Sequence, residues 1–527
     1  MPQLLQILHE LKHSLPNGGI YMSVHTFTIY DIFKMNARRY ATDVAITEQH
    51  RSLTFESLLE QVNTLAQGLL DQGIGKGDRI AILAMNHLEY LVLNGAAAAM
   101  GAILVPINWR LSLDEIAYIL DDSGAKLLFF DDARKEQLNA LMDARQFTGT
   151  TVSISATDHT HLSLAELMKD TSSPLLALAN PPKREDIFCL IYTAAVDGHP
   201  RGAALSHENM VMSNLQTCLT MGLTRKDAYL NMVPLFHITG MNLALATLHM
   251  GGKNVIMEKF DAPGAIALAR KEGVSTLASF PPILSTLLDH MDEGDLASIN
   301  HVTGIDSPDT ITAFTQKTGA RFWILYGQSE TSGFVTLSDH ALMPGAAGKQ
   351  CPVSNLAILD DDDMALPCET SGEIAVRGPV VFQGFWKKEG NLDPSTIRNG
   401  WHHTGDMGRI DKNGFLWFEG RKPEKELIKP GGENVYPAEV EKVILMHPDV
   451  VAVCVIGVPD PKFGEGVKAV CIKQPDADLD SPALIAFVGE RIARYKKPGY
   501  VEFVDTMPEK ANGTIDRIQV KQRYGTA

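Results

Sequence analysis

Alternation between amphipathic helices and short apolar strands is the feature that most limits what this chain can fold into. Residues 55–70 place apolar side chains at helical spacing and are followed by Gly73, a typical helix stop. Arg79–Ala84 has the composition of a buried strand, residues 88–100 suit a helix, and Ala102–Ile107 suits another strand. Helices between short apolar strands favour parallel-rich sheets with helices on their faces, which is an α/β fold.

Local signals carry the same rhythm further along the chain. Ser112 followed three residues later by Glu115 is a capping-box pattern, which predicts a helix start ahead of a strand at Lys126–Phe130. Further strands are expected at Ile187–Thr193, Asn254–Met257 and Phe322–Leu325.

The pattern changes twice, and these changes divide the chain. Past Leu356 it becomes strand-rich, and after Gly420 it suits a small α+β domain. In that domain we expect strands at Ala452–Ile456, Val467–Ile472 and Tyr500–Val504, and a helix at Pro482–Tyr495. Because 527 residues exceed what one core serves, we predict an N-terminal extension (1–26), a large domain (27–420) and a small C-terminal domain (421–527).

Charge and composition exclude several classes of protein. A formal net charge of −16 argues against a general nucleic-acid or membrane-surface binder, since both need basic patches. The six cysteines are widely spread and form no Cys-x-x-Cys pair, which indicates reduced thiols rather than disulfides or zinc. With no secretory signal and no apolar run long enough to span a bilayer, the expectation is a cytoplasmic protein.

Residues 399–441 combine three ligand-binding signals: the turn Thr404-Gly405-Asp406, the pair Gly420-Arg421 and the loop Gly431-Gly432-Glu433-Asn434. Glycines let the backbone pass close to a ligand, whereas Asp406 offers an acceptor and Arg421 a cationic fork. Asp406 could hold ribose hydroxyls, and Arg421 could hold phosphate or ribose oxygens. This span predicts a nucleotide site beside a domain junction.

A second signal follows the expected strand Ile187–Thr193, where the loop carries Gly198 and Arg201 and a helix is expected from Ser206. Such a loop can turn its N–H groups onto phosphate oxygens, and Thr193 adds a hydroxyl. On the residues alone, a plain surface turn is the simpler interpretation.

Two further segments contain residues suited to a site. Val233–Gly240 places His237 between apolar residues, where a satisfied core histidine is the simpler interpretation. Trp323–Thr331 follows an expected strand and includes Tyr326 and Glu330. A carboxylate there suits a hard cation such as Mg²⁺, although it would also cap the turn.

Taken in order, these motifs resemble the adenylate-forming superfamily, which includes acyl-CoA synthetases, peptide-synthetase adenylation domains and luciferases. The resemblance runs from about Phe27 to Val520. It implies a large AMP-binding domain and a small mobile domain that rotates about Glu426. It also implies ATP, Mg²⁺ and coenzyme A, with a carboxylic acid as the small-molecule substrate, and the net charge already argues against a nucleic-acid partner. A homodimer is compatible with the sequence.

The resemblance also assigns roles to individual residues. Tyr326 would stack on the adenine, His237 would line the acyl tunnel, and the Gly431–Tyr436 loop would reach the pantetheine channel in the thioester-forming pose. Thr193 and Glu330 are the predicted magnesium ligands. The predicted catalytic residues are His237, Glu330, Arg421 and Glu426. The predicted nucleotide- and coenzyme-binding residues are Thr193, Gly198, Arg201, Tyr326, Gly327, Asp406, Arg421, Gly431 and Gly432.

Some positions depart from the superfamily's pattern. Ala194–Val196 remove hydroxyls and a glycine from the phosphate loop, Asp197 adds a negative charge, and Asp306 is unusual in its turn. Thr514 stands where a lysine usually bridges the substrate carboxylate and the α-phosphate, with Lys510 four residues away. Losing a cation at that point should cost the adenylation step about 2–4 kcal/mol.

We therefore predict an AMP-forming acyl-CoA synthetase that activates a fatty or aryl acid as an acyl-adenylate and transfers it to coenzyme A. The alternative is an adenylation-impaired relative that binds nucleotide or acyl ligands, or performs only the thioester half-reaction. A peptide-synthetase domain is disfavoured because no carrier domain follows, while luciferase-like oxygenation is a rare use of the same motifs.

Overall fold

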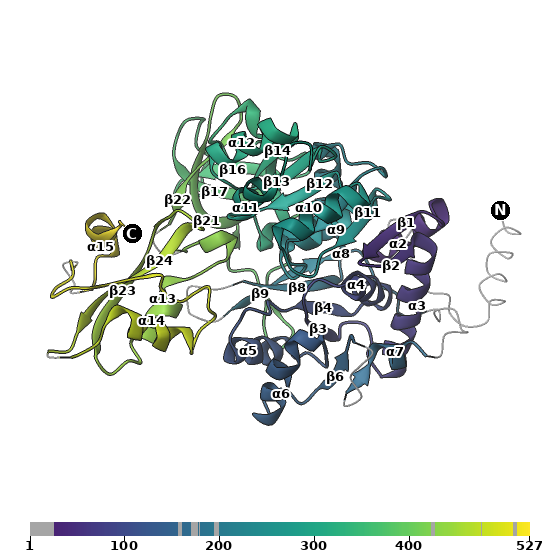
Figure 1. Ribbon diagram of the computed structural model, residues 1–527, viewed down its shortest axis with the longest axis horizontal. Helices are drawn as coiled ribbons and strands as arrows, with labels where there is room; N and C mark the ends of the chain where they lie inside the picture. Colours follow the sequence, from purple (N-terminus) through teal and green to yellow (C-terminus); the bar gives the residue numbers. More distant parts are fainter. Residues whose placement is uncertain are drawn as a thin grey trace, which may run out of the picture.

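The computed structural model describes residues 26–155, 161–169, 178, 180–193, 200–422, 427–475, 477–509 and 514–526. A large domain contains three sheets, and a small C-terminal domain contains one (Figure 1). This is the predicted α/β architecture with a small α+β domain. The last strand of the large domain, β22 (Leu416–Arg421), ends at the boundary that we place at residue 421.

One sheet of the large domain has nine strands in the order β19-β18-β9-β8-β4-β3-β5-β6-β7. Its central strands pair in parallel, as expected for strands joined by helices. The strands are β3 (Arg79–Leu83), β4 (Ile103–Pro106), β5 (Leu127–Phe130), β6 (Thr150–Ser153), β7 (Leu162–Ser163), β8 (Ile187–Thr193), β9 (Arg201–Ser206), β18 (Phe385–Trp386) and β19 (Leu392–Asp393).

A second sheet has eight strands in the order β15-β14-β13-β12-β10-β11-β1-β2. The two edge pairs, β14 with β15 and β1 with β2, are antiparallel, and the pairs between them are parallel. The strands are β1 (Val44–Glu48), β2 (Arg51–Thr54), β10 (Ala228–Asn231), β11 (Lys253–Ile256), β12 (Thr276–Ser279), β13 (His301–Gly304), β14 (Arg321–Gln328) and β15 (Gly333–Asp339).

Helices fill the space between these sheets and cover their outer faces (Figure 1). The inner helices share one apolar core with both sheets: α2 (Ile29–Arg39), α3 (Phe55–Asp71), α4 (Leu88–Met100), α8 (His207–Met221) and α9 (Ile238–His249). The outer helices are α10 (Ala262–Glu272), α11 (Ile283–His290) and α12 (Pro308–Thr318) on the eight-stranded sheet, and α5 (Leu113–Ser123) and α6 (Lys135–Asp143) on the nine-stranded sheet. Helix α4 is apolar all round because it is buried on nearly every side.

The strand-rich part of the large domain is a five-stranded sheet beside these layers. Its strands are β16 (Asn355–Leu359), β17 (Gly372–Arg377), β20 (Ile397–Arg398), β21 (Trp401–Ile410) and β22. The small domain packs α13 (Pro437–Ile444) and α14 (Ser481–Gly489) on a sheet of β23 (Val450–Asp460), β24 (Gly464–Lys473) and β25 (Tyr500–Phe503). Helix α15 (Arg517–Tyr524) lies at its outer edge, near the C-terminus (Figure 1).

One predicted helix end is wrong, and one strand was missed. Helix α14 ends at Gly489, not Tyr495, because the chain turns there and buries Ile492 and Lys496. The helix expected from Ser206 is confirmed, since α8 begins at His207 with Ser206 as its N-cap, but the strand that precedes it was not expected. Residues Arg201–Ser206 form a return strand antiparallel to β8, so α8 begins at the far end of that strand from the loop.

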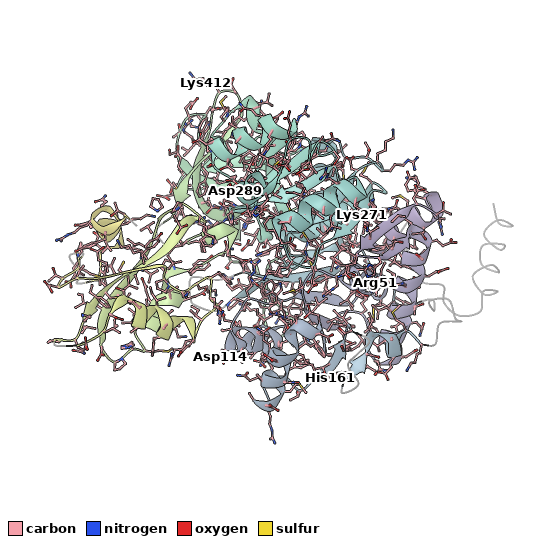
Figure 2. All side chains as sticks on the ribbon, in the orientation of Figure 1. Arg51, Asp114, His161, Lys271, Asp289 and Lys412 are labelled. Carbon is pink, nitrogen blue, oxygen red and sulfur yellow. The ribbon has the colours of Figure 1, made fainter. Side chains whose placement is uncertain are left out.

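Charged side chains such as Lys412 and Asp114, which Figure 2 labels, lie exposed on the surface. All six cysteines lie within the described residues, where none forms a disulfide and only Cys368 is exposed. Across the described part of the chain, no helix combines the length and apolar character that crossing a membrane requires.

Candidate active site

A cavity of about 540 Å³ is lined by residues of both domains. The ends of β8, β14 and β22 and the middle of β21 form one part of its wall, and most residues between 427 and 436 of the small domain form another. The structure therefore brings together most of the residues predicted for a site. Those lining the cavity are Thr193, His237, Gly327, Glu330, Asp406, Arg421, Gly431 and Gly432.

Asp406 is the centre of the hydrogen bonds on the large-domain side. The Tyr326 hydroxyl donates to Asp406 Oδ2 at 2.7 Å, Gln328 Nε2 donates to the same oxygen at 2.8 Å, and Arg421 Nε lies 3.6 Å from Oδ1. The antiparallel register of β21 and β22 places Asp406 directly opposite Arg421. Burial and the nearby Asp406 carboxylate raise the pKa of Tyr326, so its hydroxyl remains a donor.

Oxygen donors for a hard cation line the same cavity. Thr193 ends β8, and Glu330 lies in the short 3-10 turn Ser329–Thr331 that follows β14. The backbone of this turn is fixed by Phe382 N, which donates to the Glu330 carbonyl at 2.9 Å. A hydroxyl and a carboxylate on the wall of one cavity fit Mg²⁺, which prefers few protein oxygens together with substrate phosphates. Their role as metal ligands stays a prediction.

The small-domain loop passes close to the large domain, and its two glycines explain how. Gly431 has φ 58° and Gly432 has φ 87°, which favour glycine. A Cβ on Gly432 would lie 3.2 Å from Phe280 Cδ1, and one on Gly431 would lie 3.0 Å from the Pro281 carbonyl oxygen. A side chain at either position would therefore be strained and would require the loop or its large-domain neighbour to shift by a few tenths of an ångström.

Glu433, the next residue of the loop, connects the two domains by charge. His237 Nε2 lies 3.1 Å from Glu433 Oε1, Arg110 Nη1 donates to the same oxygen, and Asn108 Nδ2 lies 3.3 Å from Oε2. Although burial alone would raise it, attraction to His237 and Arg110 lowers the pKa of Glu433 to about 2. Glu433 is therefore a buried anion that fixes the orientation of His237.

Lys429 is a cavity residue that the sequence analysis missed. Burial and the nearby Arg421 cation lower the pKa of Lys429. The Asp406 and Glu465 carboxylates act in the opposite direction but do not outweigh them. Lys429 adds a cation beside the nucleotide-side residues. Its position two residues ahead of the Gly431-Gly432 pair was the available signal.

Comparison with known proteins gives the family. A model described as AMP-binding enzyme matches residues 33–386, and a model described as AMP-binding enzyme C-terminal domain matches residues 439–514. The chain belongs to the AMP-binding enzyme family. It shares 31% identity over 497 residues with a feruloyl-CoA synthase of an Amycolatopsis species, covering 93% of this chain and 97% of that protein.

Two further relatives support the same conclusion. A 2-succinylbenzoate–CoA ligase of Geobacillus kaustophilus is 32% identical over 485 residues, covering 91% of this chain and 94% of that ligase. The solved structure of the amide bond synthetase McbA from Marinactinospora thermotolerans has a TM-score of 0.84 at 26% identity, covering 95% of this chain and all of that one (100%). Within the AMP-binding enzymes, this chain is a member of the AMP-forming acyl- and aryl-CoA ligases.

Arg201, predicted for the phosphate loop, is described but does not line the cavity, and several other predicted residues lie outside the described part of the chain. The Arg201 guanidinium lies 3.7 Å from the centroid of the Phe385 ring and pairs with Asp393 at 3.2 Å, so this geometry gives no support to a phosphate contact. Gly198 and Glu426 lie outside the described residues, as do Ala194–Val196, Asp197 and Lys510, and their predicted roles stay predictions.

Two other predicted residues lie near the site or away from it. Tyr326 sits behind Asp406, with its ring tilted against Phe418 at 6.3 Å between centroids, and its stacking on adenine remains a prediction. Thr514 is exposed and is not among the residues that line the cavity. The pose of the small domain thus presents the Gly431–Glu433 loop to the cavity rather than Thr514.

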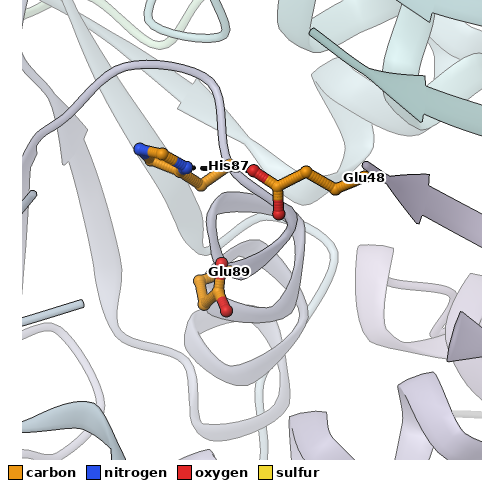
Figure 3. A group of neighbouring side chains, drawn as sticks. All are labelled: Glu48, His87 and Glu89. Carbon is orange, nitrogen blue, oxygen red and sulfur yellow. Dashed lines mark hydrogen bonds and ion pairs between the residues drawn. The ribbon is translucent and has the colours of Figure 1, made fainter. Parts of the chain in front are cut away.

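A group of two carboxylates and a histidine outside the cavity has the spacing of a metal site, but its negative charge is already balanced by an arginine. Glu48, His87 and Glu89 lie within reach of a single ion (Figure 3). Arg51 pairs with both carboxylates, and His87 lies between Glu48 at 3.0 Å and Asp131 at 3.3 Å. Although burial would lower it, the hydrogen bonds that His87 donates to these two carboxylates raise the pKa of His87 to about 10. The group is an ion-pair network that ties β1 to the start of α4.

Proposed function

We propose that this enzyme joins a fatty or aryl carboxylic acid to coenzyme A in two steps, with ATP converted to AMP and pyrophosphate. In the first step the acid's carboxylate attacks the α-phosphorus, and the bond to pyrophosphate breaks. In the second step the coenzyme A thiol attacks the acyl carbon, and AMP leaves. A cytoplasmic location, Mg²⁺ as cofactor and a homodimeric state belong to the same proposal.

The observation that carries the proposal is the meeting of two groups of residues in one cavity. Asp406, Arg421 and Glu330 provide an acceptor, a cation and a metal-binding carboxylate suited to a ribose and phosphates. The Gly431–Glu433 loop of the small domain lies at the same cavity and offers backbone that a narrow thiol-bearing chain could pass. One cavity can therefore serve activation and transfer in succession.

The acid class is inferred from the apolar part of the wall. Met232, Val233, Ile238, Phe280 and Ile283 line the cavity on the side of α9 and α11. A volume of about 540 Å³ suits a substrate larger than acetate alongside a nucleotide. Two of the relatives are named for aryl acids, feruloyl and 2-succinylbenzoate, which supports including aryl acids among the candidates.

Catalysis in this proposal consists mainly of positioning and charge neutralisation, and no side-chain nucleophile is needed. Arg421 and Lys429 offset negative charge on the phosphate side, while Asp406 fixes the sugar. When bound by Thr193 and Glu330, Mg²⁺ would supply further positive charge to the phosphate oxygens. His237, held by Glu433, lies where the acyl group passes between the two sides.

The test is a mass-spectrometric assay with ATP, Mg²⁺, coenzyme A and a panel of straight-chain and aromatic acids, following AMP, acyl-adenylate and acyl-CoA separately. We expect AMP and acyl-CoA in equal amounts from at least one fatty or aryl acid. Acyl-CoA formed only from supplied acyl-adenylates would favour the adenylation-impaired alternative, and Thr514→Lys should then raise the first step. If no acyl-CoA forms either from ATP and the acids or from supplied acyl-adenylates, the proposal is contradicted.

A further inference from the structure

A buried lysine joins the two domains beside the cavity. The Lys496 side chain is only 1% exposed, and its ammonium donates to Glu439 Oε2 at 2.5 Å and to Glu115 Oε1. Glu115 belongs to α5 of the large domain, whereas Glu439 and Lys496 belong to the small domain. One cation therefore bridges carboxylates from both domains.

The Glu115 carboxylate is held in place because each of its two oxygens accepts hydrogen bonds from a different partner. Oε2 accepts from the Ser112 backbone N–H and hydroxyl, both at 2.8 Å, which is the capping box of α5. Oε1 accepts from Lys496. The lysine therefore meets a carboxylate fixed to a helix end rather than a flexible surface side chain. The two carboxylates outweigh burial and raise the pKa of Lys496, so it is charged in this pose.

The small-domain carboxylate of this bridge, Glu439, lies close in sequence to the loop that lines the cavity. Glu439 stands in the first turn of α13, which begins at Pro437, immediately after the Gly431–Tyr436 loop. That loop carries Glu433, whose contact with His237 lies at the cavity wall. Fixing the first turn of α13 to α5 therefore limits where the loop and Glu433 can lie.

We propose that Lys496 is a positioning residue for the acyl-transfer step: it pins α13 to α5 and so holds the Glu433 loop at the cavity. This inference rests on the proposed two-step function and deepens it. Residues of the large domain that serve the first step, such as Asp406 and Glu330, keep their contacts when the pin is lost. The pin should therefore matter for transfer to the thiol and not for adenylation.

Replacing Glu115 with an uncharged residue tests the Lys496 bridge, and a second helix cap in the chain provides a matched control. Glu115→Gln keeps the helix cap but removes the charge that faces Lys496. Glu166→Gln makes the same change in the capping box of α7 (Leu164–Leu167), where Ser163 donates to Glu166 at 2.9 Å and no described residue of the small domain pairs with it. Comparing the two variants separates loss of the pin from loss of a charged cap.

Both half-reactions are measured for each variant: pyrophosphate exchange into ATP for the first, and acyl-CoA formation from supplied acyl-adenylate for the second. For Glu115→Gln we expect the second rate to fall about tenfold or more, because a buried charge loses one of its two partners, while the first stays within about twofold. Lys496→Met should behave alike, and Lys496→Arg should restore most of the second rate. Glu166→Gln should leave both rates unchanged.

A distance measurement makes failure of the pin distinguishable from failure of the function. Single-molecule energy transfer between dyes on Lys442→Cys and Glu136→Cys, in a Cys368→Ser background, reports the pose of the small domain. We expect Glu115→Gln to shift the ratio of poses about tenfold and Glu166→Gln to leave it unchanged. If the parent enzyme transfers acyl groups but the two variants match in rate and pose, the pin is overturned. If the parent makes no acyl-CoA yet Glu115→Gln still shifts the pose, the proposed function fails while the pin between domains stands.

Discussion

The two sides of the cavity are built in different ways. On the large-domain side, Asp406 and Arg421 face each other because β21 and β22 pair in register, and Tyr326 reaches them from β14. On the small-domain side, Glu433 is held by side-chain charge, through His237 and Arg110 of the other domain. One side is fixed by backbone hydrogen bonds within a domain, and the other by ion pairs across a domain boundary.

This difference indicates which part of the site is permanent and which can be dismantled. Strand pairing leaves Asp406 in place whatever the small domain does. Ion pairs across a boundary can be broken and remade at a cost of a few kcal/mol, which suits a domain that takes two poses in one catalytic cycle. We therefore expect substitutions on the two sides to affect different steps.

The largest effect should come from Asp406→Asn on the nucleotide-dependent step. The change removes a buried charge that accepts from Tyr326 and Gln328, so the rate of pyrophosphate exchange should fall about 10- to 100-fold, corresponding to about 1.5–3 kcal/mol. Acyl-CoA formation from saturating supplied adenylate should fall much less.

The control for this prediction is Asp411→Asn in the same hairpin. Asp411 is also buried and accepts from Phe415 N at 2.9 Å and Trp417 Nε1 at 3.0 Å, away from the cavity. The Asp411→Asn substitution should lower thermal stability without changing the KM for ATP. An equal loss of exchange in both variants would show that Asp406 acts only through folding.

The next effect in size is that of Glu433→Gln on acyl transfer. Losing the charge weakens contacts with His237 and Arg110, so transfer from supplied adenylate should slow about tenfold while exchange is retained. Glu441→Gln, which breaks the 2.6 Å pair with Arg517 inside the small domain, is the matched control and should spare transfer. Equal slowing of exchange by Glu433→Gln would contradict the division of roles.

The pH dependence of that contact follows from the lowered pKa of Glu433. Its stabilising energy is present above the ordinary value of 4.5 and is lost only as the pH falls through about 2. Stopped-flow measurement of transfer in the parent enzyme should therefore show no break due to Glu433 above about pH 4.5. A break that Glu433→Gln abolishes within the neutral range would show that this carboxyl is not held as an anion.

A smaller effect is expected from Gly432→Ala, compared with Gly414→Ala. Both glycines have positive φ, 87° and 80°, so both variants carry a similar backbone strain of about 1 kcal/mol. Only the Cβ at 432 meets the large domain, at Phe280, whereas the one at 414 meets nothing within 4 Å. Acyl transfer should slow several-fold in Gly432→Ala alone. Matching kinetics in the two variants would place the loop away from Phe280 during transfer.

The smallest effect should be that of Arg201→Met. The guanidinium stacks on Phe385 and pairs with Asp393, so its loss should lower stability by about 1 kcal/mol through lost packing. The KM for ATP should change by less than about twofold, since a structural contact is all that is removed. A tenfold rise in that KM would return Arg201 to the phosphate-binding role that the resemblance implies.

Much of the fold could be predicted from local patterns. Helix α3 and the capping box of α5 follow from periodicity and from Ser112 with Glu115, and strands β3, β4 and β8 follow from apolar runs. Short apolar runs do not say whether the next segment returns antiparallel, so β9 was taken for a loop leading into a helix. Arg201 was therefore expected in a phosphate-binding loop, whereas it begins a strand and contacts Phe385 and Asp393.

The site was predictable where it lies within one motif and not where it spans domains. Asp406, Arg421 and the glycine pair stand within one short span, so their meeting could be expected. The contact of Glu433 with Arg110, and of Lys496 with Glu115, joins residues hundreds of positions apart. Such pairs depend on how two domains pack, and no local pattern encodes them.

The most direct test of this division is a single-turnover rapid-quench experiment on Glu433→Gln with ATP, coenzyme A and the preferred acid. Acyl-adenylate and acyl-CoA are followed over time in the variant and the parent enzyme. We predict that the variant forms acyl-adenylate at the parent's rate and accumulates it, because only its consumption by the thiol is slowed. If formation and consumption slow together, or neither changes, the two sides of the cavity do not serve separate steps.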